Sequence, residues 1–158
     1  MVGRRAFTLI EVIVVTVLMA MLAAVLVTRL SGAASREFDI ATEKVSDLML
    51  MYAIRSEFAS EPVGITMDPN RNSLSLVIRR GERDDMNNGW VPDLSVREVR
   101  LPDFLPVQQM EFLVDGDSVD PSDKPIRNLP GQPRPGLEVT LKSNDSQLAR
   151  SVRLTLTP

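Results

Sequence analysis

The sequence predicts an α+β fold in which one long N-terminal helix, half of it suited to a membrane, packs on a mainly antiparallel β-sheet or sandwich head. Three observations lead to this class. An apolar run occupies most of residues 7–28, apolar side chains recur at alternating steps of three and four over residues 38–59, and from residue 63 onward they alternate with a period of two. About 100 residues remain for the head, which is enough for one compact domain.

The apolar run is long enough to cross a bilayer. The 22 residues from Phe7 to Thr28 give about 33 Å of helix, against a hydrocarbon core of roughly 30 Å. Arg4 and Arg5 precede the run, and positive residues at a short flank favour its retention in the cytoplasm. We therefore expect a single-pass membrane protein with a cytoplasmic N-terminus.

Two ordinary explanations of this run are open. A cleaved secretory signal has an apolar region of about 7–15 residues closed by small side chains; Ala33-Ala34-Ser35 resembles such a site, but the run here is longer. A plain signal anchor explains the length and the two arginines. It does not explain Glu11, because a charged side chain near the bilayer centre costs about 2.5–3.5 kcal/mol on insertion scales.

The residues around Glu11 carry a family resemblance. Residues 4–12, Arg-Arg-Ala-Phe-Thr-Leu-Ile-Glu-Val, resemble the processing signal of type IV prepilins and type II secretion pseudopilins. The resemblance implies a pilin-like fold and a leader peptide of residues 1–6. It also implies that a prepilin peptidase cuts between Ala6 and Phe7 and that Phe7 becomes N-methylated. The family usually has glycine at the position of Ala6, and alanine is also small.

The same resemblance gives Glu11 a role as the fifth residue of the mature chain. Cleavage gives Phe7 a positively charged amine at the membrane boundary. Two opposite charges are tolerated at low dielectric when they pair. We therefore predict that Glu11 is an assembly residue, pairing with the amine of its own chain or of a neighbouring subunit.

Residues 7–30 are expected to form the transmembrane and assembly helix, and residues 31–61 its amphipathic continuation. Helical spacing places one set of side chains on a single face, where a sheet would cover it. This set comprises Phe38, Ala41, Val45, Leu48, Tyr52, Arg55 and Ala59. Pro62 cannot continue a helix, so the helix should end near residues 59–61.

Residues 62–158 are expected to form the periplasmic β head. Period-two patterns predict strands at residues 63–67, 73–80, 95–101, 109–114, 136–142 and 151–157. Turn residues separate these strands, including Asn87-Asn88-Gly89, Asp115-Gly116 and a proline-rich loop over residues 121–135. No pattern in this region indicates an internal repeat.

A second resemblance narrows the family. Residues 52–58, running into Val63-Gly64-Ile65, look like the end of the first helix in H-type minor pseudopilins and their pilus relatives. Arg100-Leu101-Pro102 and residues 110–116 look like that group's pre-strand proline and its strand and turn. Major pseudopilins fit less well, because they usually have proline at mature position 22, which is Thr28 here.

One acidic loop offers candidate calcium ligands: Asp115, Asp117, Asp120 and Asp123. Calcium takes six to eight oxygen ligands, and major pseudopilins bind calcium in their heads. The spacing does not match an EF-hand loop, and acidic loops are usually only solvated. No other metal and no cofactor is expected.

Charge is unevenly distributed over the head. Residues 60–123 carry six basic and thirteen acidic side chains, whereas residues 124–158 carry six basic and two acidic ones. Binding to nucleic acid needs clustered cations, so a nucleic-acid partner is not expected of this acidic head. The asymmetry fits docking of acidic against basic faces between unlike subunits.

Composition argues against an enzyme. The chain contains no histidine and no cysteine, which removes the usual general base, thiolate metal sites and catalytic triads that depend on histidine. A structural role is therefore expected.

The function predicted from these features is that of an H-type minor pseudopilin of a type II secretion system, assembled near the tip of a periplasmic pseudopilus. Its expected partners are the prepilin peptidase, major and minor pseudopilins, the inner membrane and exported proteins. One alternative is a minor pilin of a type IV pilus that serves pilus assembly or DNA uptake. The other is a signal-anchored periplasmic binding domain that never assembles.

Overall fold

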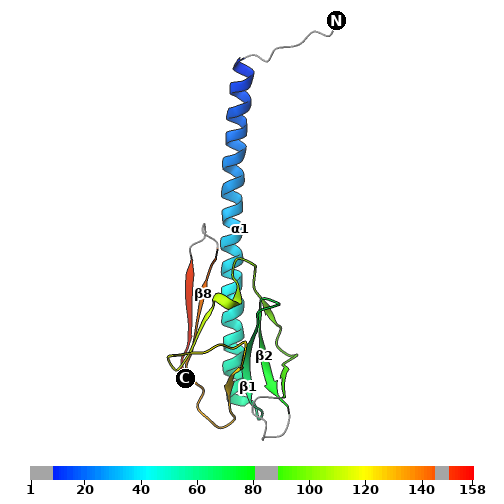
Figure 1. The fold of residues 1–158 in the computed structure, drawn as a ribbon, viewed down its shortest axis with the longest axis vertical. Helices are drawn as coiled ribbons and strands as arrows, with labels where there is room; N and C mark the ends of the chain where they lie inside the picture. Colours follow the sequence, from blue (N-terminus) through cyan, green and yellow to red (C-terminus); the bar gives the residue numbers. More distant parts are fainter. Residues whose placement is uncertain (1–8, 81–88, 145–149) are drawn as a thin grey trace. The chain divides into compact units, whose positions relative to one another are not determined.

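The computed structural model describes residues 9–80, 89–144 and 150–158, with side chains omitted at 27–31. The chain divides into two compact units, Met1–Arg36 and Glu37–Pro158. Helix α1 (Leu9–Phe58) contributes to both. The α+β, pilin-like arrangement is as predicted (Figure 1).

Within the second unit, α1 places one apolar stripe in the core. Phe38, Val45 and Tyr52 are exposed by 1% or less, and their spacing of seven residues keeps them on one helical face. The helix ends at Phe58, slightly before the predicted end, and the amide of Ala59 still donates to the carbonyl of Arg55 at 2.9 Å. Pro62 follows, where a further helical turn would need an amide hydrogen.

The first sheet is built around a hairpin of β1 (Val63–Asp68) and β2 (Ser73–Arg79). Strand β3 (Trp90–Pro92) and strand β4 (Val99–Arg100) pair with β2, and β7 (Ile126–Asn128) pairs with β1. All four pairings are antiparallel.

The second sheet has the order β6-β5-β8-β9. Its strands are β5 (Glu111–Val114), β6 (Asp117–Ser118), β8 (Leu137–Lys142) and β9 (Ser151–Leu156), and a short 3-10 helix, η1 (Val107–Gln109), precedes them. In the view of Figure 1, β8 and the β1–β2 hairpin lie to either side of the C-terminal part of α1. Side chains from this part of α1 and from both sheets form one hydrophobic core.

The predicted strands need several corrections. Residues 95–101 were expected to form one strand, but only Val99 and Arg100 pair with a neighbour. Strands β3 and β6 and, inside the predicted proline-rich loop, β7 were not expected. Gly64 explains part of this, because a Cβ there would lie 3.0 Å from the carbonyl oxygen of Ile126 and 3.4 Å from the Trp90 ring. Glycine on β1 thus permits the close approach of β7 and Trp90.

Asn72 fastens the β1–β2 turn to the segment that follows β4. Its backbone has a φ of 49°, a left-handed conformation that asparagine tolerates better than most residues. Its side-chain amide donates to the carbonyls of Leu101 and Pro102 at 3.1 Å each. Its side-chain oxygen accepts from the amide of Val107 at 2.7 Å. One turn residue therefore positions residues 101–107.

Tyr52 is completely buried on the core face of α1. Neither its hydroxyl nor that of Ser56 has a well-formed hydrogen bond with the described residues. Burial raises the pKa of Tyr52 to about 12, and the nearby Ser56 hydroxyl offsets only part of this rise. A buried hydroxyl without a partner costs free energy. The ring of Tyr52 therefore stabilises the head while its hydroxyl does not.

We expect Tyr52→Phe to raise the free energy of unfolding of the head by up to about 2 kcal/mol, because the unpartnered hydroxyl is removed. The unfolded tyrosine loses its proton near pH 10. The wild type should therefore lose on the order of 2 kcal/mol as the pH rises from about 10 to 12, and Tyr52→Phe should not. The full-length protein in detergent can be unfolded with urea and followed by fluorescence of Trp90, its one tryptophan.

Tyr52→Ala is the matched control and should cost about 3–5 kcal/mol, as other large aromatic truncations do. If Tyr52→Phe destabilised the head by more than about 1 kcal/mol, the hydroxyl would be contributing a hydrogen bond, and this account of the core would be wrong.

Candidate processing and assembly site

The N-terminal part of α1 is apolar on every side. The stretch Leu9–Leu26 is long and apolar enough to cross a membrane, and its large hydrophobic side chains are 47–81% exposed. A helix that is hydrophobic all round needs an apolar environment. Within the described residues no protein surface supplies it, so this stretch is suited to lipid or to the helices of other subunits.

Thr16 does not add an unsatisfied polar group to this stretch. Its hydroxyl lies 3.0 Å from the carbonyl oxygen of Val12 and 2.9 Å from that of Ile13. In lipid, polar groups must be satisfied inside the segment. Thr16 meets that requirement within its own helix.

Glu11 is different from Thr16. It is the one charged residue between Leu9 and Leu26, it lies in the first turn of α1, and it is exposed. The N-terminal turn of a helix carries partial positive charge, which favours a carboxylate there by about 0.3–1 kcal/mol at exposed sites. The helix end thus offsets part of the cost of a charge in an apolar stretch. A cationic partner for Glu11 stays a prediction from the sequence.

The predicted processing residues Ala6 and Phe7 lie outside the described residues. The cut between them, the methylation of Phe7 and the leader of residues 1–6 remain predictions from the sequence.

The predicted calcium ligands do not converge. The Asp115 carboxylate accepts from the amide of Gly136 at 2.7 Å, and the Asp120 carboxylate accepts from the amide of Ser122 at 2.9 Å. The hydroxyl and amide of Ser122 lower the pKa of Asp120. Over residues 9–80, 89–144 and 150–158, no three acidic side chains are grouped closely enough to hold a metal ion. Asp115 instead links the turn after β5 to the residue before β8, and Asp120 fixes a local turn. Asp117 and Asp123 do not join them in a group that could hold a metal ion.

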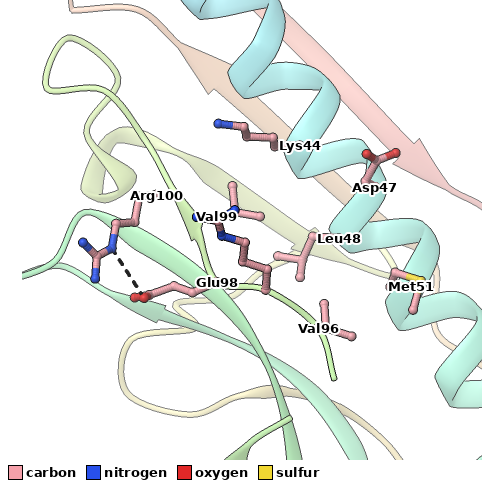
Figure 2. A pocket seen from close by; sticks show the side chains of 9 residues that line it. Lys44, Asp47, Leu48, Met51, Val96, Glu98, Val99 and Arg100 are labelled. Carbon is pink, nitrogen blue, oxygen red and sulfur yellow. Dashed lines mark ion pairs between the residues drawn. The ribbon is translucent and has the colours of Figure 1, made fainter. Parts of the chain in front are cut away.

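A surface groove of about 620 Å³ runs between α1 and the segment before and through β4. Figure 2 shows Lys44, Asp47 and Met51 on α1 and Glu98 and Arg100 on the facing segment. The rim is charged, and Leu48 and Val99 contribute apolar surface.

The negative charge of Glu98 in this groove is stabilised by two neighbouring side chains. It accepts a 2.5 Å hydrogen bond from the Ser73 hydroxyl and lies 3.5 Å from the Arg100 guanidinium. The Ser73 hydrogen bond, followed by the charge of Arg100, lowers the pKa of Glu98. A carboxylate held ionised in this way does not act as a general acid or base near neutral pH. The groove is therefore a surface feature of the head in which Glu98 is held as a carboxylate.

A polar network that the sequence patterns did not reveal secures the end of α1. Arg55 pairs with the mostly buried Asp93 at 3.4 Å and donates to the Ser95 hydroxyl. Burial raises the pKa of Asp93, but hydrogen bonds from Ser95 and the charge of Arg55 outweigh it and lower that pKa overall. Its spacing predicted that Arg55 lies on the core stripe, whereas its guanidinium reaches the rim of the head.

Several basic residues of the C-terminal region are paired with acids. Arg150 lies 2.7 Å from Asp39, and its guanidinium sits 5.2 Å from the centre of the Phe38 ring. Lys142 pairs with Glu111 at 3.3 Å. These pairs link the C-terminal region to α1 and to β5.

Comparison with protein families matches residues 1–27 to the prokaryotic N-terminal methylation motif. No curated protein and no solved structure is significantly similar to the chain. The motif implies processing by a prepilin peptidase and assembly with other pilin-like subunits. Together with the one apolar helix at the N-terminus, it indicates single-pass membrane anchoring.

The matched residues include the predicted leader, Phe7, Glu11 and the apolar half of α1 up to Leu26. The second unit adds an amphipathic helix covered by antiparallel sheets. The chain thus carries a prepilin-type N-terminal methylation motif on an α+β, type IV pilin-like arrangement.

Proposed function

We propose that the protein is a minor pseudopilin of a type II secretion system. In this proposal the prepilin peptidase removes residues 1–6, Phe7 is methylated, and the mature chain joins a short periplasmic pseudopilus near its tip. Its work is mechanical, and the chain catalyses no reaction. The other pilin-like subunits and exported proteins are its partners.

The observation that carries this proposal is the lone acid on an exposed apolar helix inside a methylation motif. Glu11 has no ion pair with the described residues, while Phe7 acquires an amine when the leader is cut. Each charge is costly in lipid without the other. A filament that stacks subunits along α1 brings the amine of one chain to the carboxylate of the next, so pairing is gained on assembly.

The same elements favour one orientation in the membrane. Arg4 and Arg5 precede the apolar stretch, and the positive-inside rule places them in the cytoplasm. The head, which begins beyond the other end of the apolar stretch, then lies in the periplasm. This also exposes the leader to a peptidase at the cytoplasmic face.

The resemblance to H-type minor pseudopilins that the sequence suggests at residues 52–58, 100–102 and 110–116 favours a minor over a major subunit. Residues in these segments have defined structural roles in the head. Tyr52 lies in the core, Pro102 accepts from Asn72, and β5 ends at the turn formed by Asp115 and Gly116, both with positive φ.

Deletion of the gene in the source bacterium tests the proposal. We expect exported proteins to accumulate in the periplasm and to disappear from the culture medium, with complementation by the intact gene. Loss of surface pili or of DNA uptake with normal secretion would assign the protein to a type IV pilus instead. Normal secretion and normal pili would instead favour the alternative of a signal-anchored periplasmic binding domain that never assembles.

A further inference from the structure

We propose that the free edge of β9 is the site at which a neighbouring, unlike pilin-like subunit adds an extended strand. The inference rests on the proposed function in one respect, because it assumes that the head meets other subunits in an assembly. It is carried by the register, burial and charge of β9 itself.

Register shows which backbone groups of β9 are free. The amide of Ser143 donates to the carbonyl of Arg150 at 3.0 Å, and the pairing continues with Leu141 opposite Val152 and Val139 opposite Leu154. Hydrogen-bonded and non-hydrogen-bonded pairs alternate in an antiparallel ladder. The even-numbered residues of β9 therefore bond to β8, and the amides and carbonyls of Ser151, Arg153 and Thr155 point away from it.

The pairing of β8 with β5, on its other side, gives the same alternation of hydrogen-bonded residues. The amide of Asp115 donates to the carbonyl of Gly136 at 2.9 Å, so the even-numbered residues of β8 bond to β5 and the odd-numbered ones to β9. Strand β9 is the last strand of its sheet, with β8 as its neighbour in the described chain. Figure 1 shows it, in red, at the margin of the head.

The remaining sheet edges of the described head are short or blocked. Strand β3 has three residues and includes Pro92, and β4, β6 and β7 have two or three residues each. Short edge strands and proline are ordinary protections against strand addition. Strand β9 has six residues, with no proline among them. It ends where the carbonyl of Thr157 accepts a hydrogen bond from Arg134.

Burial indicates what kind of strand fits. On β8 the inward side chains of Leu137, Val139 and Leu141 are 0–1% exposed. Their partners on β9 are Leu156, Leu154 and Val152, which pack on the core but remain half-buried. A strand added beside β9 with apolar residues at alternate positions would cover this remaining surface.

Charge indicates an unlike partner. A second copy that used all three free residues would place Arg153 directly opposite its own counterpart, and like charges in that position destabilise a strand pair. Arg153 is exposed and lies 3.6 Å from Glu138 at the closest approach of their charged atoms. A carboxylate on the incoming strand opposite Arg153 would favour pairing. The occupant is therefore an extended strand of another pilin-like head, with alternating apolar residues and an acid at its centre.

Hydrogen exchange on the full-length protein tests this site residue by residue. Amides of residues 151, 153 and 155 should exchange quickly in detergent and at least about tenfold more slowly in sheared filaments. Amides of residues 152, 154 and 156 bond to β8 in both states and serve as internal controls. The test requires filaments that contain methylated Phe7, so their absence contradicts the proposed function and not the site. If filaments form and the three amides exchange as they do in detergent, the inference is wrong.

Two variants test the free edge of β9 separately from the folding of the head, and a third serves as a control. Thr155→Pro removes a free amide, and proline is tolerated at an outward-facing edge position. It should lower incorporation into filaments at least about threefold, while Thr155→Val, which keeps the amide, should not. Arg153→Gln removes the positive charge without placing a second acid beside Glu138, and it should lower incorporation without altering the backbone. Unchanged incorporation of both Thr155→Pro and Arg153→Gln would overturn the proposal.

The mass of a cross-linked product identifies the subunit that occupies the β9 edge. The chain has no cysteine, so Thr155→Cys carries a single thiol that can hold a photoreactive label. A cross-linked product that combines this chain with a different pilin-like subunit supports the proposal. A product with twice the mass of the mature chain would mean that a second copy occupies the edge, and would overturn the unlike partner.

Discussion

Glu11→Ala should leave the protein in the membrane with its head folded, yet reduce its recovery in sheared filaments at least about tenfold, which corresponds to about 1.4 kcal/mol of lost pairing. The anchor should persist because the substitution removes the one charge from the exposed apolar stretch Leu9–Leu26. The head should persist because its core draws its helical side chains from Phe38 onward. What is lost is the carboxylate that neutralises the amine of Phe7.

Two further variants make the Glu11 result specific. Glu11→Gln keeps the size of the side chain but not its charge, so it should fail like alanine. Thr16→Val is the matched control, because the Thr16 hydroxyl is satisfied inside its own helix and its loss should not affect assembly. Quantitative immunoblotting of the filament and membrane fractions measures all three. Normal recovery of Glu11→Ala would show that charge pairing does not drive assembly.

Ala6→Leu should block processing, so that the precursor accumulates with residues 1–6 attached. The resemblance to prepilins implies a small residue before the scissile bond, and leucine adds bulk without charge. The uncut chain retains Arg4 and Arg5. Its formal net charge therefore stays at 18 − 21 = −3, whereas the mature chain should have 16 − 21 = −5. Gel mobility and isoelectric focusing of the membrane fraction both report the difference.

Ala6→Gly is the control for this experiment. It introduces the residue that the family usually has and should be processed at least as fast as the wild type. If Ala6→Leu matured normally, the scissile bond would not lie after Ala6. The assignment of Phe7 as the mature N-terminus would then be wrong.

The long helix and most long strands were predictable because their signals are local. The seven-residue spacing of Phe38, Val45 and Tyr52 identifies a buried helical face without knowledge of the rest of the chain. Alternation at residues 137–142 and 151–156 likewise identified β8 and β9. In both cases the pattern in the sequence is the pattern of burial.

The short strands and the division into two sheets depend on contacts between distant residues. Strand β7 forms because β1 offers it a free edge at Gly64, and nothing within its own three residues indicates this. The Arg55–Asp93 pair joins residues 38 positions apart, and Asn72 reaches residues 101–107. Such contacts arise from the tertiary fold, so local patterns did not reveal them.

Glu11 could be singled out from the sequence for a different reason. Membrane insertion imposes strong constraints on composition, so one acid in an apolar stretch is visible in the sequence alone. Residues 1–27 match the N-terminal methylation motif, and the role of Glu11 in assembly stays a prediction. The calcium ligands were less predictable, since carboxylates such as Asp115 and Asp120 can equally accept hydrogen bonds from backbone amides.

The measurement that tests this account most directly is mass spectrometry of the intact protein purified from the membranes of its source bacterium, with fragmentation of its N-terminal peptide. The account requires a chain that begins with N-methylated Phe7 and has Glu11 as its fifth residue. A chain that still begins at Met1, or that begins near Ser35, would mean that no amine is created for Glu11 to neutralise.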